Sequence, residues 1–183
     1  GILMWGYAFF GRVHGMPPVE IGIWMAGIVG IGGSLGTYLG GRLADRLGRA
    51  KPSRYMTIPA LATLASLPLA AGFLLAEKSE TAMISFFFFY ILANIYVPSL
   101  HTINQNLARL RMRATAAAIV LLIINLVGAG AGPFVVGFLN DYFAPTYGAE
   151  AIRYSLLSLA CTMVPGALCF YLGGRSLAAD LSR

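Results

Sequence analysis

The hydrophobic residues of this chain come in long runs, separated by short polar segments that hold most of its charges. A helix needs roughly 20 apolar residues, at about 1.5 Å each, to cross about 30 Å of hydrocarbon. By that criterion the runs predict six helices, at about 1–11, 19–41, 55–76, 82–107, 114–140 and 152–174. The first run is too short to cross, so we interpret it as the outer half of a truncated helix that precedes five complete ones.

The composition fits a protein that is solvated by lipid. Hydrophobic residues make up 58% and charged residues 11% of the chain, against roughly 45–50% and 25% in soluble globular domains. A net charge of +6 would suggest nucleic acid binding in a soluble protein, but here the cations lie between the apolar runs. We therefore expect an all-α membrane protein without a nucleic acid partner.

The positive charges are distributed unevenly between the two sides of the predicted bundle. Ten of them fall on one side: Arg42, Arg46, Arg49, Lys51, Arg54, Arg109, Arg111, Arg113, Arg175 and Arg183. Three fall on the other side: Arg12, Lys78 and Arg153. The positive-inside rule then makes the first side, with the carboxyl terminus, cytoplasmic.

The densest group of charges lies in the connection after the second run. Residues 41–51 read Gly-Arg-Leu-Ala-Asp-Arg-Leu-Gly-Arg-Ala-Lys. This segment resembles the G-x-L-A-D-R-x-G-R-x-K motif of the major facilitator superfamily, which joins the second and third helices of each six-helix half and helps to close the cytoplasmic gate. The positive-inside rule alone would explain the arginines of this segment, but it would not explain the aspartate or the two glycines. The resemblance thus implies a secondary transporter with these gate residues: Gly41, Asp45, Arg46, Gly48 and Arg49.

Further stretches extend the resemblance to one branch of that superfamily. Residues 96–106, 111–118 and 125–133 are similar to the carboxyl-terminal half of spinster-type transporters. The resemblance implies that residues 1–183 are helices seven to twelve of a twelve-helix carrier in a bacterial inner membrane, whose amino-terminal half is absent. It also implies alternating access, a lysophospholipid or sphingoid substrate, proton coupling and no cofactor.

Polar residues at membrane depth indicate where a substrate would bind. Asn94 and Asn125 lie near the centres of their runs, and a buried amide needs a hydrogen-bonding partner. Either these amides bond across helices, or they face a water-filled cavity and hold a ligand head group. Together with Trp5, Tyr7 and Tyr96 they are the candidates for lining a midplane cavity, whose mostly apolar wall would suit an amphiphile.

His101 lies in the polar stretch that ends the fourth run. A neutral imidazole titrates near physiological pH, so His101 is a candidate proton or gate residue. The alternative is an interfacial histidine that only makes hydrogen bonds. No Asp, Glu, Lys or Arg falls in the middle of a complete run, so coupling charges are expected in the absent half.

Small residues and prolines predict how the helices pack and bend. In the second run Gly32, Gly36 and Gly40 recur every four residues, with Gly33, Thr37 and Gly41 beside them, which predicts close approach of a neighbouring helix. The fifth run has a similar series at Gly128, Gly132 and Gly137. Prolines predict bends at Pro59, Pro68, Pro98, Pro133 and Pro165. The bends either flex during transport or give the bundle a fixed shape.

Two other functions stay open. A major facilitator carrier for drugs, organic ions or other small solutes would share every feature above. An intramembrane enzyme would need paired acids, a His/Asp metal set or an activated serine at membrane depth. The runs contain none of these, so we expect no catalytic and no metal site.

Overall fold

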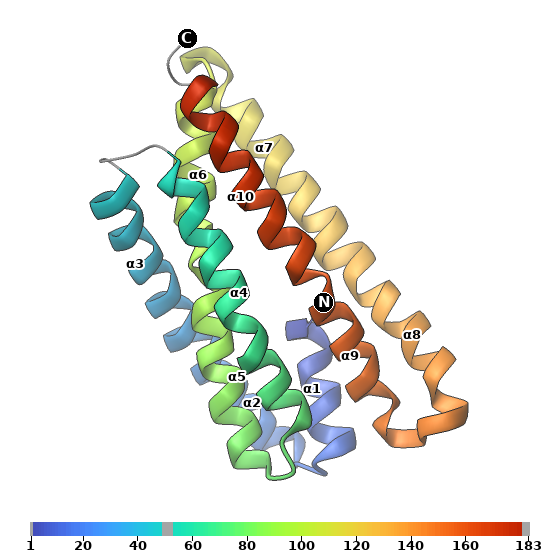
Figure 1. Ribbon diagram of the computed structural model, residues 1–183. Coiled ribbons are helices and arrows are strands. Elements are labelled where there is room, and N and C mark those ends of the chain that lie inside the picture. The colour runs from blue at the N-terminus through green and yellow to red at the C-terminus, as the bar shows by residue number, and fades with distance from the viewer. Residues whose placement is uncertain (1, 49–52, 181–183) are drawn as a thin grey trace.

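Helices and their short connections form the whole of the computed structural model, which describes residues 2–48 and 53–180. No strand occurs within those two ranges. The helices run side by side, and the connections lie at the two ends of the bundle (Figure 1). The predicted all-α architecture is therefore confirmed.

Each predicted run corresponds to one rod of the bundle. The first is α1 (Ile2–Val13) and the third is α4 (Arg54–Leu75). The other rods have internal changes of helix type or breaks. The second consists of α2 (Pro18–Gly27), a π-helical segment η1 (Ile28–Gly32), α3 (Gly33–Leu43) and a second π-helical segment η2 (Ala44–Gly48). The fourth consists of α5 (Ser79–Asn94) and α6 (Tyr96–Leu107). The fifth consists of a 3-10 turn η3 (Leu110–Met112), α7 (Arg113–Ile123), a π-helical segment η4 (Ile124–Ala131) and α8 (Gly132–Tyr147). The sixth follows a 3-10 turn η5 (Gly148–Glu150) and consists of α9 (Ala151–Cys161) and α10 (Met163–Asp180).

Four helical stretches of the described chain are long and apolar enough to cross a membrane. The last of them, Leu110–Arg175, reverses direction at Gly148, whose φ of +53° suits glycine because other residues have a Cβ that clashes there. Its two arms, α7–α8 and α9–α10, count as two spans, and α8 of the first packs against α9 of the second. The structure thus has five full crossings, while α1 covers only the half of the bundle opposite residues 41–48 (Figure 1).

Two of the rods break just before a proline. α5 ends and α6 begins around Ile95, three residues before Pro98, and α9 gives way to α10 at Thr162, three residues before Pro165. At both breaks the backbone N–H bonds to the carbonyl three residues back. The cause is the proline ring, which removes one donor and crowds the carbonyl four residues earlier. By contrast, α4 continues through both of its prolines.

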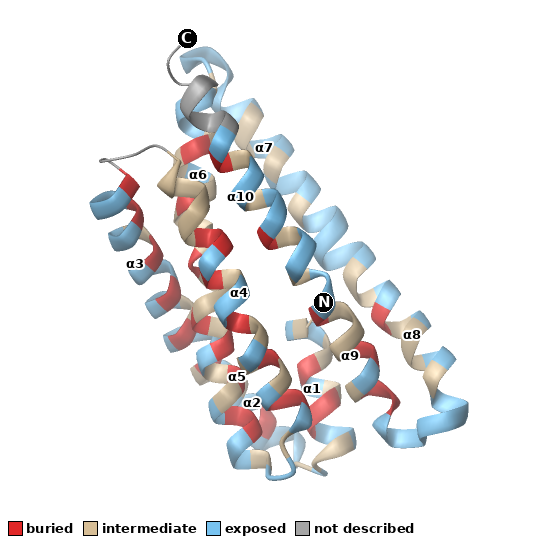
Figure 2. Ribbon diagram, viewed as in Figure 1, coloured by how far each residue is buried: buried red, intermediate tan, exposed pale blue. Residues whose placement is uncertain are grey.

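The apolar core lies at the end of the bundle opposite the motif. It is built around a cluster of aromatic rings from α1, α4 and α5: Phe9, Phe10, Phe73, Phe86 and Phe89. Each of these rings is at most 4% exposed, and most neighbouring pairs meet edge to face, with centroids 4.9–6.0 Å apart. Figure 2 shows buried residues concentrated there and along α4 and α5, while α7 is mostly exposed.

The glycines of the second rod pack directly against the fourth rod, as predicted. A Cβ added at Gly36 would clash with the backbone carbonyl of Ile91, and one added at Gly40 would clash with the carbonyl of Ile95. Gly32 is also covered, by the ring of Phe87 at 3.3 Å. The same packing is not found at Gly128 in the fifth rod, where an added Cβ would meet no atom within 4 Å.

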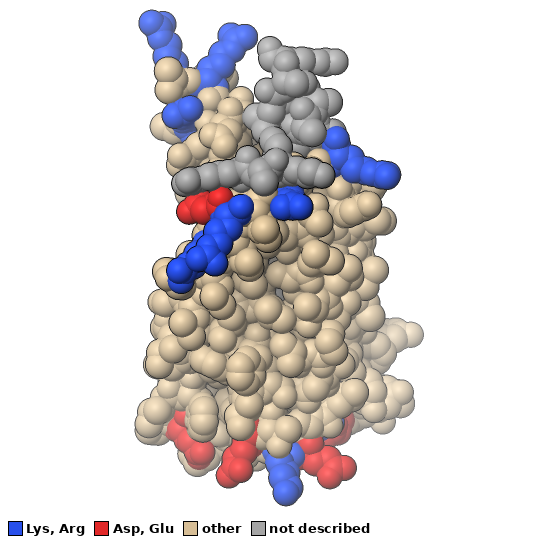
Figure 3. All heavy atoms as spheres, turned by 60° about the vertical axis from the view of Figure 1, so that its left-hand side comes forward, with Lys and Arg blue, Asp and Glu red and all other residues tan. Residues whose placement is uncertain are grey.

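The charges of the described residues separate along the bundle axis (Figure 3). Most lysines and arginines gather at the end that carries the motif, together with Asp45. Five acids lie in or near the connections at the opposite end: Glu20, Glu77, Glu80, Asp141 and Glu150. This agrees with the unequal distribution inferred from the sequence, whereas the cytoplasmic assignment of the basic end stays a prediction.

Candidate functional site

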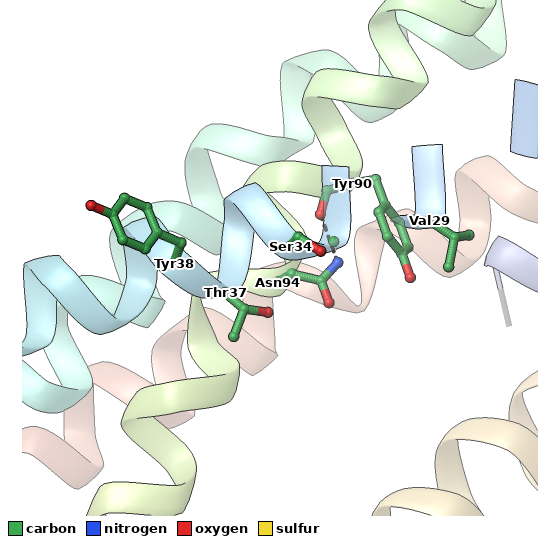
Figure 4. Close-up of a pocket in the computed structure, with 7 residues that line it drawn as sticks. Val29, Ser34, Thr37, Tyr38, Tyr90 and Asn94 are labelled. Carbon is green, nitrogen blue, oxygen red and sulfur yellow. Dashed lines mark hydrogen bonds between the residues drawn. The ribbon is translucent and has the colours of Figure 1, made fainter. Parts of the chain in front are cut away.

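An open groove of about 580 Å³ lies between the second and fourth rods. Figure 4 shows Ser34, Thr37 and Asn94 side by side at its centre, with Tyr38 at one end and Tyr90 at the other. Val29 and Gly33 complete the lining. Its walls thus combine hydroxyl and amide groups with apolar surface and carry no charged side chain.

The groove is formed by two helical stripes in which residues recur every four positions. One stripe is on α3: Gly33, Thr37 and Gly41. The other is on α5 and α6: Tyr90, Asn94 and Pro98. A Cβ added at Gly33 would lie 3.3 Å from the Tyr90 ring, and one at Gly41 would lie 3.9 Å from Pro98. The stripes therefore face each other in register, and the two glycines keep the floor of the groove clear of side chains.

The amide of Asn94 is held by its own helix. Its Nδ2 donates to the carbonyl oxygen of Tyr90 at 2.8 Å. Because an amide oxygen is an acceptor with two lone pairs, this bond leaves Oδ1 able to accept a hydrogen bond from a ligand. The cross-helix bond considered for Asn94 is not made, and the hydroxyls of Ser34 and Thr37 add both donors and acceptors beside it.

A second hollow of about 520 Å³ extends the groove towards the motif. It shares Thr37 and Tyr38 with the first hollow and adds Gly41, Arg42, Asp45 and Pro98. Arg42 Nη1 donates to the Tyr38 hydroxyl at 3.0 Å, and its guanidinium lies 5.8 Å from the centre of that ring. The polar centre of the groove is thus continuous with the charged segment that resembles a gate.

The described gate residues are helical. Gly41 lies within α3, and Asp45, Arg46 and Gly48 lie in η2. The ring of Tyr55 would be only 2.6 Å from a Cβ at Gly48, so this glycine permits close packing of α4 on η2. Asp45 and Arg46 are exposed. The fifth predicted gate residue, Arg49, lies outside the described residues.

The remaining cavity candidates are spread over other faces. Trp5 Nε1 donates to the carbonyl of Pro133 at 3.2 Å, which ties the first rod to the fifth. Tyr7 is 45% exposed on α1. Tyr96 packs beside Phe170 of α10, with ring centroids 6.2 Å apart, and does not line the groove.

Asn125 and His101 are both exposed. Asn125 lies in the π-helical segment η4 and donates from Nδ2 to the carbonyl of Leu121 at 2.8 Å, so it too bonds within its own helix. His101 lies on α6 one turn beyond Pro98, close to the groove stripe on that rod. Of the predicted cavity residues, the structure therefore places only Asn94 in the groove.

Sequence reasoning did not identify four of the groove-lining residues as cavity candidates: Ser34, Thr37, Tyr38 and Tyr90. A signal for them exists in the chain. Ser34 and Tyr38 are four residues apart on α3, and the face of that helix that packs on the fourth rod carries glycines. Tyr90 is four residues before Asn94. Polar side chains at that spacing lie on one helix face, so they indicate a polar strip in otherwise apolar spans.

A second histidine lies at the opposite end of the bundle, outside the spans. The ring of His14 stacks on Phe10 and meets Phe9 edge to face. Burial lowers the pKa of His14, and the nearby Arg153 lowers it further, while Glu150 acts in the opposite direction. Glu150 is paired with Arg153 at 2.7 Å. The neutral imidazole is therefore favoured, which fits a packing role better than proton transfer.

Comparison with known proteins agrees with this architecture. The chain is 34% identical over 176 residues to a protein of Mycolicibacterium smegmatis described as an MFS-type efflux pump. The match covers 95% of the chain and 41% of that relative. No protein-family model matches the sequence.

Solved structures share the fold. One is a bacterial homolog of the human lysosomal transporter Spinster in an inward-facing, unoccupied conformation, with a TM-score of 0.85 and 22% identity. The match covers 98% of this chain and 46% of that one. The inward-facing, occupied form gives a TM-score of 0.82 at 21% identity and covers 99% and 46%. The chain thus spans about half the length of the proteins it matches. Its fold is that of one half of a spinster-type transporter of the major facilitator superfamily, and most of its sequence is similar to part of an MFS-type efflux pump.

Proposed function

We propose that this chain is the carboxyl-terminal half, helices seven to twelve, of a secondary transporter that works by alternating access. The observation that carries the proposal is the open groove between α3 and α5, which joins a polar centre to the segment that resembles a gate. In transporters built from two halves, substrate sites lie near the midplane where the halves meet. A second half placed over this groove would enclose such a site.

The fifth rod supports the same arrangement. Its middle part, from α7 into η4, is exposed on most of its surface in this chain: Ile119, Leu122, Ile123, Leu126 and Val127 are 52–67% exposed. Extended apolar surface of this kind is covered by a partner or by lipid. We assign one face of this rod, with Asn125, to the cavity shared with the second half, and Trp5 and Tyr7 on α1 to its rim.

The groove favours an amphiphile as substrate. Ser34, Thr37 and Asn94 offer neutral hydrogen-bonding groups for a head group. Val29 and the rings of Tyr38 and Tyr90 offer apolar surface for a chain. We therefore propose a lysophospholipid or sphingoid compound. A second candidate is a drug-like or other small solute, because the M. smegmatis relative is described as an efflux pump.

The gate is assigned to η2 and the end of α6. An Asp45 carboxylate would accept hydrogen bonds from exposed N–H groups at a helix end of the second half, where the helix dipole favours an anion. Arg46 and Arg49 would hold carboxylates or lipid phosphates, and His101 lies on the same side as a further gate residue. This end faces the cytoplasm of a bacterial inner membrane in our proposal, and proton coupling is assigned to charges of the second half.

Transport by the whole protein tests the substrate class. The full-length transporter, reconstituted into phosphatidylcholine vesicles, should move fluorescent lysophosphatidylcholine faster than protein-free vesicles do. An excess of unlabelled lysolipid should compete, whereas a quaternary organic cation should not. Transport of the cation without competition by lysolipid would contradict the amphiphile proposal and support the small-solute candidate.

A further inference from the structure

A second groove, of about 340 Å³, lies between α4 and α10. It shares no residue with the groove between α3 and α5. Its deepest residues are Ala60 and Ala167, which are 3% and 2% exposed. Its walls are larger side chains that stay open to the outside: Leu61, Leu64, Val164, Leu168 and Tyr171. Apart from Thr57 and the Tyr171 hydroxyl, the lining is apolar, as a surface in contact with lipid chains would be.

Each wall follows one helical stripe. On α4 the stripe is Thr57, Leu61 and Leu64, and on α10 it is Val164, Leu168 and Tyr171. Such spacings of three and four residues place side chains on one face of a helix. Continued towards the basic end of the bundle, both stripes reach a cation. Arg54 lies three residues before Thr57, and Arg175 lies four residues after Tyr171.

The two cations lie where the helices are in close contact. A Cβ added at Gly174 would be 3.0 Å from the carbonyl oxygen of Ser53 and 3.1 Å from the Met56 side chain. Gly174 and Ser53 are the chain neighbours of the two arginines, so Arg175 and Arg54 lie at the same level of the bundle. The Arg175 guanidinium is held 5.6 Å from the centre of the Tyr171 ring, which itself lines the groove.

We propose that this groove binds an anionic phospholipid of the surrounding bilayer. One acyl chain lies between α4 and α10, and the phosphate is bound by Arg54 and Arg175 at the edge of the hydrocarbon. Guanidinium groups bind phosphate through charge-assisted hydrogen bonds in a fixed geometry. Basic residues next to a span also attract anionic lipid. The apolar trough and the paired arginines match the two parts of a single lipid.

Lipid binding to the purified full-length transporter tests the proposal. Native mass spectrometry can titrate phosphatidylglycerol and phosphatidylcholine separately against the protein. Phosphatidylglycerol should bind more tightly at one site. Arg54→Gln/Arg175→Gln should weaken that site about 25-fold, from about fivefold for each arginine. Arg54→Lys/Arg175→Lys should retain most of the binding because the charge is kept.

A matched pair of substitutions distinguishes lipid binding in this groove from general attraction of anionic lipid to the basic end of the bundle. Arg109→Gln/Arg111→Gln removes the same charge from the same end of the bundle, but from an exposed turn that does not line this groove. This pair should change phosphatidylglycerol binding by less than about twofold. Leu168→Ser keeps both arginines but removes apolar surface from the α10 wall of the groove, so it should weaken binding of the acyl chain.

Two results would overturn the proposal. In the first, both glutamine pairs reduce binding equally while their melting temperatures match the native protein, which would show attraction without a site. In the second, the Leu168→Ser protein and the native protein bind phosphatidylglycerol identically and no site distinguishes it from phosphatidylcholine. That result would follow if the second half of the transporter occupied the groove.

Discussion

Replacing Gly36 with alanine should destabilise the protein, although alanine is the better helix former by about 1 kcal/mol. The new Cβ would clash with the Ile91 carbonyl and lie 2.9 Å from Cβ of Asn94. A backbone carbonyl cannot rotate away as a side chain does, so α3 and α5 must separate. Forcing extra atoms into a packed contact costs about 1–3 kcal/mol, which exceeds the gain in helix propensity. The melting temperature of the full-length protein in detergent should fall.

Gly22→Ala is the control for this substitution. Gly22 also lies inside the second rod, in α2, but a Cβ there would meet no atom within 4 Å. Its melting temperature should equal or slightly exceed that of the native protein. Equal losses in the Gly36→Ala and Gly22→Ala proteins would show that any added methyl group disturbs this rod, and the close contact with α5 would lose its support.

Replacing Thr37 with tryptophan should block transport without loss of folding. Thr37 is exposed and lines both hollows, so an indole at this position would fill the passage from Asn94 to Asp45. Crowding a binding site costs about 1–3 kcal/mol, and each 1.4 kcal/mol is tenfold in affinity. Substrate flux into vesicles should therefore fall about tenfold or more.

The control places the same large ring on a face that lines neither hollow. Ile84 is 53% exposed on α5, and Ile84→Trp should leave transport within about twofold of the native rate because it narrows no passage. Both variants should keep the native melting temperature. Full activity of the Thr37→Trp protein would mean that substrate does not pass along the α3–α5 groove.

Much of the fold follows from the sequence because a bilayer admits few solutions. Only helices satisfy their backbone groups within a single span, so run lengths predicted every rod, with ends that differ from the structure by at most seven residues. The spacing of Gly32, Gly36 and Gly40 predicted close approach of a neighbouring helix, which the structure identifies as the fourth rod. Bends were predicted at the prolines because proline lacks a backbone donor, and the structure breaks its helices before Pro98 and Pro165 but not at Pro59 and Pro68 of α4.

The site was harder to predict because run length says nothing about which way a side chain faces. Tyr96 and Asn94 are two residues apart, yet Tyr96 packs on Phe170 of α10 while Asn94 lines the groove. Two positions along a helix rotate a side chain by about 200°, so one groove cannot hold both. Thr37 was noted beside the glycines, but its role as a groove residue depends on the register between α3 and α5.

Reagent accessibility at Ser34 tests most directly whether the α3–α5 groove is the substrate passage of an alternating-access carrier. In a full-length protein whose exposed Cys161 and Cys169 are replaced by serine, Ser34→Cys should react with a membrane-impermeant thiol reagent added from either side, and lysolipid should slow both reactions. Asp45→Asn should weaken the closed gate. The cysteine should then react faster with reagent added from the side of the membrane that carries residues 41–48. A cysteine at this position that reacts from one side only, unaffected by lysolipid and by Asp45→Asn, would contradict the assignment of this groove.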